Sequence, residues 1–274
     1  MSRAIRGARL AGLGYSTGME AFSAGLAPSI LLISIAFTIL AGFVKGAVGF
    51  AMPMIMISAL GSFMSPDIAL AALIVPTVLT NVWQALRTGP RAAFEAARHH
   101  WLYLFIVLVF IALSAQLVRL MPAEVMYLVL GVPITLFAAI QLLGVRLSFR
   151  PEHRRRAEVL TASFAGFVGG ISGVWGPPTV AYLTALDTPK AEQIRIQGVI
   201  YGLGAVALAL AHLRSGVLNA ETLPFSVFMT IPALAGMAIG FRLGDRLDQV
   251  RFRKATLFVL AIAGLNLVRR GLGF

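Results

Sequence analysis

Long apolar runs alternate with short polar breaks along this chain. The breaks carry proline, glycine or charged residues, which are signals of turns and loops. Several uncharged runs approach the roughly 20 residues that a helix needs to cross a lipid bilayer. The pattern therefore predicts an all-α polytopic membrane protein. The apolar segments fall at about 29–60, 67–86, 101–118, 125–143, 159–186, 193–212, 223–241 and 252–268.

The first apolar segment is too long for a single crossing. As one helix, its 33 residues from Pro28 to Leu60 would be about 50 Å long, whereas the hydrocarbon core is about 30 Å thick. The stretch "GFVKGAVGFAMP" at 42–53 puts three glycines and a proline near the middle, and such residues weaken or end a helix. We expect a re-entrant hairpin, in which the chain enters the membrane, turns at the glycines and leaves on the same side.

The glycine motif occurs twice, because residues 166–178 read "GFVGGISGVWGPP". A shift of 127 positions also aligns "LRTG" at 86–89 with "LRSG" at 213–216. The chain is therefore predicted to contain a duplication. A shift of 124 positions aligns Gly42, Phe43, Val44, Gly46, Gly49 and Pro53 with Gly166, Phe167, Val168, Gly170, Gly173 and Pro177.

The duplication predicts two halves, each a re-entrant broken-helix hairpin followed by three transmembrane helices. Three is an odd number of crossings, so the halves are expected to be inverted relative to one another, as in many secondary transporters. The expected parts are a basic N-terminal tail (1–28), repeat 1 (29–147, hairpin 29–60), a cytoplasmic linker (148–157) and repeat 2 (158–274, hairpin 159–186).

Composition and charge agree with a membrane protein. Of the 274 residues, 58% are hydrophobic and 12% are charged, whereas soluble domains carry about 25% charged residues. The net charge of +12 comes from arginines between apolar runs, which indicates cytoplasmic loops rather than a nucleic-acid partner. If every segment crossed, the loops on the two sides would hold 9 and 8 Lys/Arg. With re-entrant hairpins, the loops on one side would hold 15 Lys/Arg and the loops on the other side would hold 2. The positive-inside tendency therefore favours the hairpins.

The sequence offers no catalytic or metal-binding set. The chain has no cysteine, so disulfides and thiolate ligands are excluded. His99, His100, His153 and His212 show no ligand spacing, and no HExxH, P-loop or GxSxG motif occurs. We therefore expect no catalytic residue, no metal and no cofactor.

Lys45 is the most informative single residue, because it is the only charge between Pro28 and Leu60. An ammonium near the bilayer centre costs about 2.5 to 3.5 kcal/mol on insertion scales. This cost favours a counter-charge for an anion, in a cavity with backbone N–H donors and helix N-termini. The alternative is a lysine that snorkels to the surface or pairs with a carbonyl. Its repeat mate is Gly169, so a cation site would be asymmetric.

Other residues in and near the two motifs also have more than one possible role. The motif glycines either let helices pack closely or form a turn that presents N–H groups to a substrate. Trp175 is a substrate wall, core filler or an interfacial anchor, and Ser172 is a candidate hydroxyl donor. Asn81, Gln84 and Gln197 are amides inside apolar spans, where they bind substrate or link helices.

These motifs resemble the TauE/SafE family of sulfite-exporter-like permeases, whose repeated unit opens with a glycine-rich stretch closed by proline. The resemblance covers roughly 30–272 and implies export of small sulfur-containing or organic anions across the inner membrane of a bacterial cell. Phe50-Ala51-Met52 and Val174-Trp175-Gly176 occupy the places of a glycine run in typical members, and the bulky apolar groups among them favour an organic anion over sulfite. The expected substrate-binding residues are Lys45, Gly46, Gly49, Phe50, Pro53, Asn81, Gln84, Gly170, Ser172, Gly173, Trp175, Gly176, Pro177 and Gln197.

The leading functional hypothesis is a secondary transporter that exports such an anion. A channel-like pore for an anion or neutral solute is the alternative, and an intramembrane enzyme would lack a nucleophile or metal set. No acidic residue lies inside an apolar segment, which suits an anion uniporter driven by the membrane potential. The expected partners are the anion and the lipid bilayer, without nucleic acid, and a homo-oligomer is left open.

Overall fold

The computed structural model describes residues 26–87, 89–145, 153–186, 188, 190–243 and 248–273, and all regular secondary structure in these ranges is helical. Nearly all of the N-terminal tail and half of the linker expected at 148–157 lie outside the described residues. The helices are α2 (Pro28–Val48), α3 (Met52–Leu60), α4 (Pro66–Leu86), α5 (Pro90–His99), α6 (Trp101–Ser114), η1 (Ala115–Leu120), α7 (Ala123–Leu142), α8 (Arg154–Ser172), α9 (Gly176–Ala185), α10 (Lys190–Ser215), α11 (Leu223–Leu243) and α12 (Gln249–Gly271).

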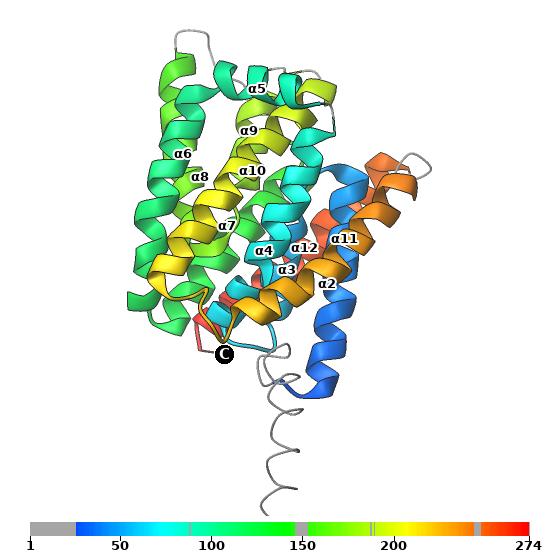
Figure 1. Ribbon diagram of the computed structural model, residues 1–274, viewed down its shortest axis with the longest axis vertical. Helices are drawn as coiled ribbons and strands as arrows, with labels where there is room; N and C mark the ends of the chain where they lie inside the picture. Colours follow the sequence, from blue (N-terminus) through cyan, green and yellow to red (C-terminus); the bar gives the residue numbers. More distant parts are fainter. Residues whose placement is uncertain are drawn as a thin grey trace, which may run out of the picture.

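Six of the described helical segments are long and apolar enough to cross a membrane. Their outward-facing side chains are apolar, as Leu32, Phe105 and Leu210 illustrate, each at least 60% exposed. Exposed apolar side chains on this scale suit lipid rather than water. The six segments are Pro28–Ala47, Pro66–Leu86, Trp101–Leu120, Ala123–Leu142, Arg195–Ser215 and Leu223–Leu243, and they make up much of the helical bundle seen in Figure 1.

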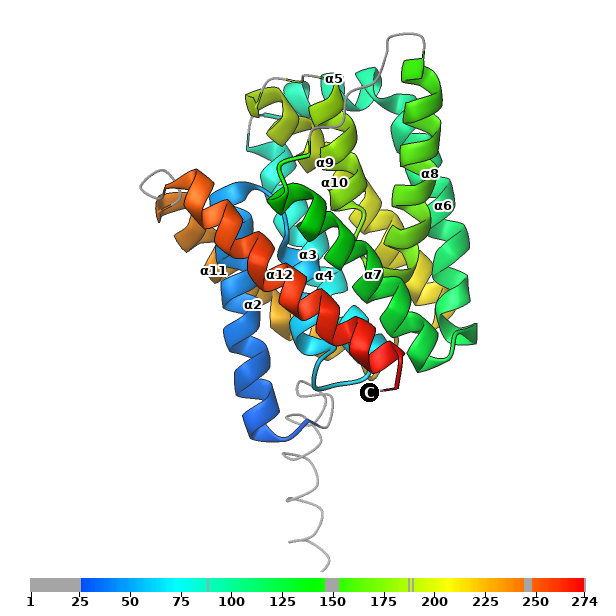
Figure 2. The same ribbon diagram turned by 180° about the vertical axis from the view of Figure 1, so that it is seen from behind.

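The first glycine motif breaks the helix and reverses the chain. Gly49, with φ 84°, ends α2 in the left-handed conformation, and its N–H donates to the Lys45 carbonyl at 2.7 Å. Ala51 is also left-handed, with φ 79°, and Pro53 follows at the start of α3. From this break α3 runs back toward the end of the molecule at which α2 begins (Figures 1 and 2). A turn in the middle of the apolar segment is confirmed.

The second motif breaks in the same way. Gly173, with φ 71°, caps the end of α8 at Ser172, and α9 begins at Gly176, so residues 173–175 are not helical. Here α8 begins, and α9 ends, at the upper end of the molecule in Figure 1, opposite to the end that holds the start of α2. The two helix breaks therefore approach one another inside the bundle.

The limbs of each broken pair differ in length. The 21 residues of α2 are about 31 Å long and the 9 residues of α3 about 14 Å, at 1.5 Å per residue. The 19 residues of α8 and the 10 of α9 show the same imbalance. The short limbs α3 and α9 alone could not cross a bilayer.

Glycines bring α2 close to α11. A Cβ on Gly46 would lie 2.9 Å from the Gly240 Cα, and a Cβ on Gly240 would lie 3.0 Å from the Gly46 Cα. Gly42 and Gly236 meet the facing helix backbone at similar range. This is the small-residue packing that membrane helices use in place of a hydrophobic driving force.

Glycines of the second motif serve the equivalent contact of α8 with α6. A Cβ on Gly166 would lie 2.7 Å from the Val107 carbonyl oxygen, and one on Gly170 would lie 2.6 Å from that of Ile111. The earlier glycines of each motif thus allow close helix packing, which was one of the two interpretations of the motif glycines. Gly49 and Gly173 instead form the turns, which was the other interpretation.

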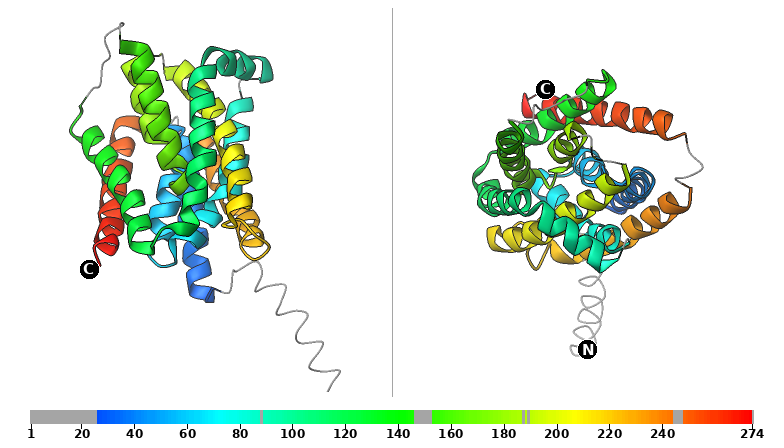
Figure 3. Two further views of the ribbon diagram at one scale, coloured as in Figure 1. Left: turned by 90° about the vertical axis from the view of Figure 1, so that its left-hand side faces the viewer. Right: turned by 90° about the horizontal axis from the view of Figure 1, so that it is seen from above.

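Two further helix pairs complete the bundle. The α4 and α10 helices cross closely, because a Cβ on Gly198 would lie 3.1 Å from the Ala85 Cα. The α7 and α12 helices pack side by side along one face, as Figure 2 shows. The polar break at 87–100 contains a helix that the hydropathy pattern missed, α5, which lies across the upper end of the bundle (Figure 3). Its amphipathic sequence suits a membrane surface.

Candidate functional site

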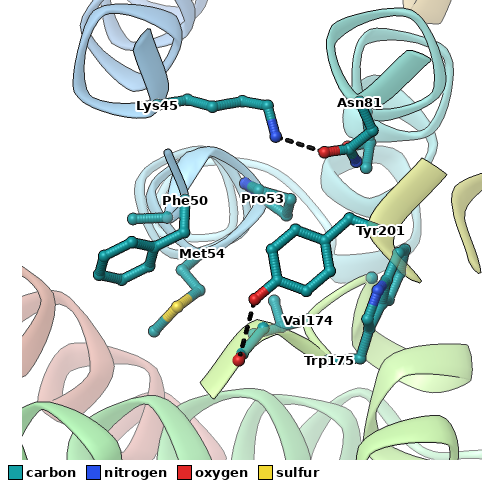
Figure 4. Close-up of a pocket in the computed structure, with 12 residues that line it drawn as sticks. Lys45, Phe50, Pro53, Met54, Asn81, Val174, Trp175 and Tyr201 are labelled. Atoms are coloured by element: carbon teal, nitrogen blue, oxygen red, sulfur yellow. Dashed lines mark hydrogen bonds between the residues drawn. The ribbon is translucent and has the colours of Figure 1, made fainter. Parts of the chain in front are cut away.

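The two helix breaks and the crossing of α4 with α10 enclose a cavity (Figure 4). The cavity volume, taken as the space open to the centre of a water-sized sphere, is about 20 Å³. This is room for about one water molecule. Its lining is largely apolar, with a few convergent polar groups, as in many small-molecule sites. The lining residues are Lys45, Phe50, Ala51, Pro53, Met54, Thr77, Asn81, Gly173, Val174, Trp175, Gly176 and Tyr201.

Lys45 extends from the last turn of α2 to α4. It is 1% exposed, and its Nζ donates a hydrogen bond to the Asn81 Oδ1. The ion pairs formed by the described residues, Arg91–Glu95 and Arg251–Asp248, do not involve Lys45. The last turn of a helix favours a cation, but a lysine has three N–H donors. The bond to Asn81 uses one donor, so the ammonium retains capacity for an anion.

Backbone at the two breaks forms the rest of the polar environment. The α3 and α9 helices both begin at the cavity, and helix N-termini carry partial positive charge and free N–H groups. Pro53 and Pro177 have no N–H, so donors must come from neighbouring residues. Ala51 holds a left-handed conformation that non-glycine residues rarely adopt, and such backbone is common at functional sites.

Aromatic residues form the side of the cavity next to the second break. The Tyr201 hydroxyl donates to the Gly176 carbonyl at 3.2 Å, and its ring meets Trp175 edge to face with centroids 6.5 Å apart. Behind them, the Thr179 hydroxyl donates to the Trp175 carbonyl at 2.8 Å and lies 3.0 Å from the Tyr103 hydroxyl. These contacts hold the start of α9 against α10 and α6.

The structure brings half of the expected substrate-binding residues into the cavity wall. Asn81 accepts the hydrogen bond of Lys45, and this bond links α4 to α2. The expected residues that line the cavity are Lys45, Phe50, Pro53, Asn81, Gly173, Trp175 and Gly176.

The other expected residues lie outside the described lining. Ser172 donates to the Val168 carbonyl at 2.6 Å and accepts from the Val174 N–H at 3.0 Å, so its hydroxyl braces the second break. Gln84 and Gln197 are buried on α4 and α10. Gly46 and Gly170 face neighbouring helices, Gly49 forms the first turn, and Pro177 lies in the first turn of α9.

Several residues of the site were not expected from the sequence. Thr77 lies one helical turn before Asn81, and this i, i+4 spacing could have placed it on the same face. Tyr201 had no comparable signal in its apolar span. Outside the cavity lining, His212 in the last turn of α10 is fully buried, and its Nε2 lies 2.8 Å from the Gly170 carbonyl oxygen at the end of α8. That oxygen can only accept, so Nε2 carries the proton.

The described residues hold no cluster of three or more histidine or carboxylate side chains that could bind a metal ion. Comparison with known proteins gives one match. The family model described as Sulfite exporter TauE/SafE matches residues 34–267, which is most of the chain. No curated protein and no solved structure matches the sequence or the fold.

Proposed function

We infer that this chain, which belongs to the sulfite exporter TauE/SafE family and is a membrane transporter, exports a small organic or sulfur-containing anion. Sulfonates and carboxylates are the substrate types that we propose. We propose the inner membrane of a bacterial cell as its location, as the family resemblance implies.

The observation that carries this proposal is the buried ammonium of Lys45. It is 1% exposed and bonded to a neutral amide. None of the described lining residues is acidic. A buried charge is normally paired, and two helix N-termini beside it favour negative charge. A bound anion would supply the missing partner, because the described lining of the cavity contains no carboxylate.

We also propose that the two halves are inverted repeats and that each broken pair is a re-entrant hairpin. The helix contacts support this, because α2 packs on α11 as α8 packs on α6. Two further large contacts, α4 with α10 and α7 with α12, each join a helix to its counterpart in the other half. A site between inverted repeats can open to either side when the halves exchange conformations.

A test of the topology uses single cysteines, which are informative because the chain has none. Ser65 is exposed in the turn before α4, and Glu95 is exposed on α5 at the other end. We expect an impermeant maleimide to label Ser65→Cys from outside intact cells and Glu95→Cys only after the membrane is opened. Labelling of Ser65→Cys only from the cytoplasm would contradict the re-entrant topology.

The small size of the cavity favours a transporter over the channel-like alternative. Its free space suits about one water molecule, whereas a conducting pore needs a continuous path. We propose uniport driven by the membrane potential, because an anion that leaves a negative interior gains about 2.3 kcal/mol per charge per 100 mV. The absence of an acidic group among the described lining residues supports this mode over proton coupling through a cavity carboxylate.

Flux measurements in proteoliposomes test the function. We expect saturable movement of ethanesulfonate or propionate, faster when the compartment that holds the anion is made negative. Flux that rises linearly with concentration would instead support the channel-like pore. Dependence on a pH gradient at constant potential would replace uniport with proton coupling. No anion flux under any of these gradients would contradict the proposed function.

A further inference from the structure

The Trp175 side chain lies in a slot between two helices whose walls are glycines. A Cβ on Gly169 of α8 would lie 2.9 Å from the Trp175 Cβ and 3.0 Å from its Cε3. A Cβ on Gly204 of α10 would lie 3.0 Å from the Cε2 and 3.1 Å from the Cζ2 and Nε1. Real Cβ atoms essentially never approach within 3.0 Å, and contacts of 3.0–3.1 Å are tighter than most, so the indole fits closely because both positions lack a side chain.

The indole is held by these contacts rather than by a hydrogen bond. Trp175 is 2% exposed, and its Nε1 has no hydrogen-bond partner among the residues that the structure describes. Buried tryptophans usually find a partner for this group. An indole without one can shift without breaking a hydrogen bond, so packing alone fixes this part of the wall.

Trp175 and Lys45 line the same cavity from different elements. In the view of Figure 4, Lys45 and Asn81 lie at the upper side and Trp175 and Val174 at the lower side. The repeat explains why the two sides of the cavity differ. The 124-residue shift pairs Lys45 with Gly169, and Ala51 with Trp175. The first half thus supplies the charge, and the second half supplies an aromatic group that occupies space beside the lysine's own counterpart.

We propose that Trp175 is the specificity-determining residue of the cavity and that its indole sets how large the organic part of the anion is. The assignment rests on the proposed function, since it assumes that Lys45 fixes the anionic head. With the head at Lys45 and Asn81, the organic part extends toward Val174 and Trp175. Contacts from α8 and α10 confine the ring, so its position decides how much room remains.

Two opposite changes follow from the slot. Trp175→Phe and Trp175→Ala remove part of the wall and should admit longer substrates. Gly204→Ala adds a methyl group against the Cε2 edge and should press the ring into the cavity, because α8 already confines it on the Gly169 side. Each additional methylene that the site can bury is worth about fourfold in affinity. The preferred chain length should thus rise in the first two variants and fall in the third.

The experiment measures dissociation constants of the purified full chain in lipid nanodiscs for alkanesulfonates from methanesulfonate to hexanesulfonate, with the matching carboxylates in parallel. We expect the length of the tightest binder to shift by at least one carbon, upward in Trp175→Phe and Trp175→Ala and downward in Gly204→Ala. Trp101→Phe is the control, because Trp101 is 63% exposed on the outer surface and should leave the series unchanged.

The outcomes separate the two proposals. An unchanged length preference in Trp175→Phe and Gly204→Ala, with wild-type binding intact, overturns the role of Trp175 and leaves the anion site standing. If Trp175→Ala does not fold, the comparison of these two variants decides. Failure of the wild type to bind any member of either series overturns the proposed function and the specificity assignment with it.

Discussion

Gly173→Val is expected to abolish anion transport while the chain remains folded and inserted. Gly173 has φ 71°, a left-handed conformation that a β-branched residue adopts only with strain of about 1–3 kcal/mol. A Cβ there would also lie 2.7 Å from the Leu73 Cδ1. Because Gly173 lines the cavity at the second break, relief of this strain must change the cavity itself. The measurement is initial flux in proteoliposomes together with monodispersity of the purified protein.

Gly144→Val is the control variant, because it places the same backbone strain at a position away from the cavity. Gly144 has φ 70°, nearly the same conformation, but no atom lies within 4 Å of its Cβ position, at the exposed end of α7. This variant should transport normally. Gly49→Val, at φ 84° in the first break, should resemble Gly173→Val. Loss of folded protein in both break variants would instead assign these two glycines to helix packing.

Lys45→Met is expected to weaken anion binding about 10- to 100-fold, because hydrogen bonds to a charged group contribute about 1.5–3 kcal/mol and each 1.4 kcal/mol is tenfold. Methionine fills a volume similar to that of the lysine stem, and the cost of burying an ammonium disappears. The thermal stability of the empty protein should therefore stay equal or rise. Binding is measured by calorimetry with the tightest sulfonate or carboxylate of the wild type.

Two variants control for charge and for lysine substitution in general. Lys45→Arg should keep part of the affinity, because the charge remains while the compact ammonium becomes a planar fork. Lys254→Met removes a lysine that is exposed near the start of α12 and should leave affinity unchanged. Equal affinities in Lys45→Met and the wild type would show that Lys45 does not contact the anion.

The local chemistry of the chain predicted much of the fold. Apolar runs with few charges specify membrane helices, because backbone polar groups in lipid must bond within the segment. Glycine followed by proline specifies where such a helix breaks, and both breaks, at Gly49 and Gly173, lie in the motifs that the sequence indicated. The family resemblance is also confirmed over residues 34–267.

The sequence was less informative wherever a residue has more than one use. Gly46 and Gly49 are three positions apart in one motif, yet the first packs against α11 and the second forms the turn. The α5 helix escaped the hydropathy pattern because Arg91, Glu95, Arg98 and His99 interrupt its short sequence and none of its residues is buried. Side-chain periodicity records which residues are apolar but not which neighbour they meet.

By itself, then, the sequence determined the membrane class, the two breaks and the buried lysine, because hydropathy, glycine and proline act over a few neighbouring residues. The tertiary structure alone decided that Lys45 meets Asn81 from α4, that Tyr201 reaches the second break, and that Gly169 and Gly204 make room for Trp175. These contacts join residues that are distant along the chain. They depend on which faces of the helices come together, and packing of the whole bundle fixes that arrangement.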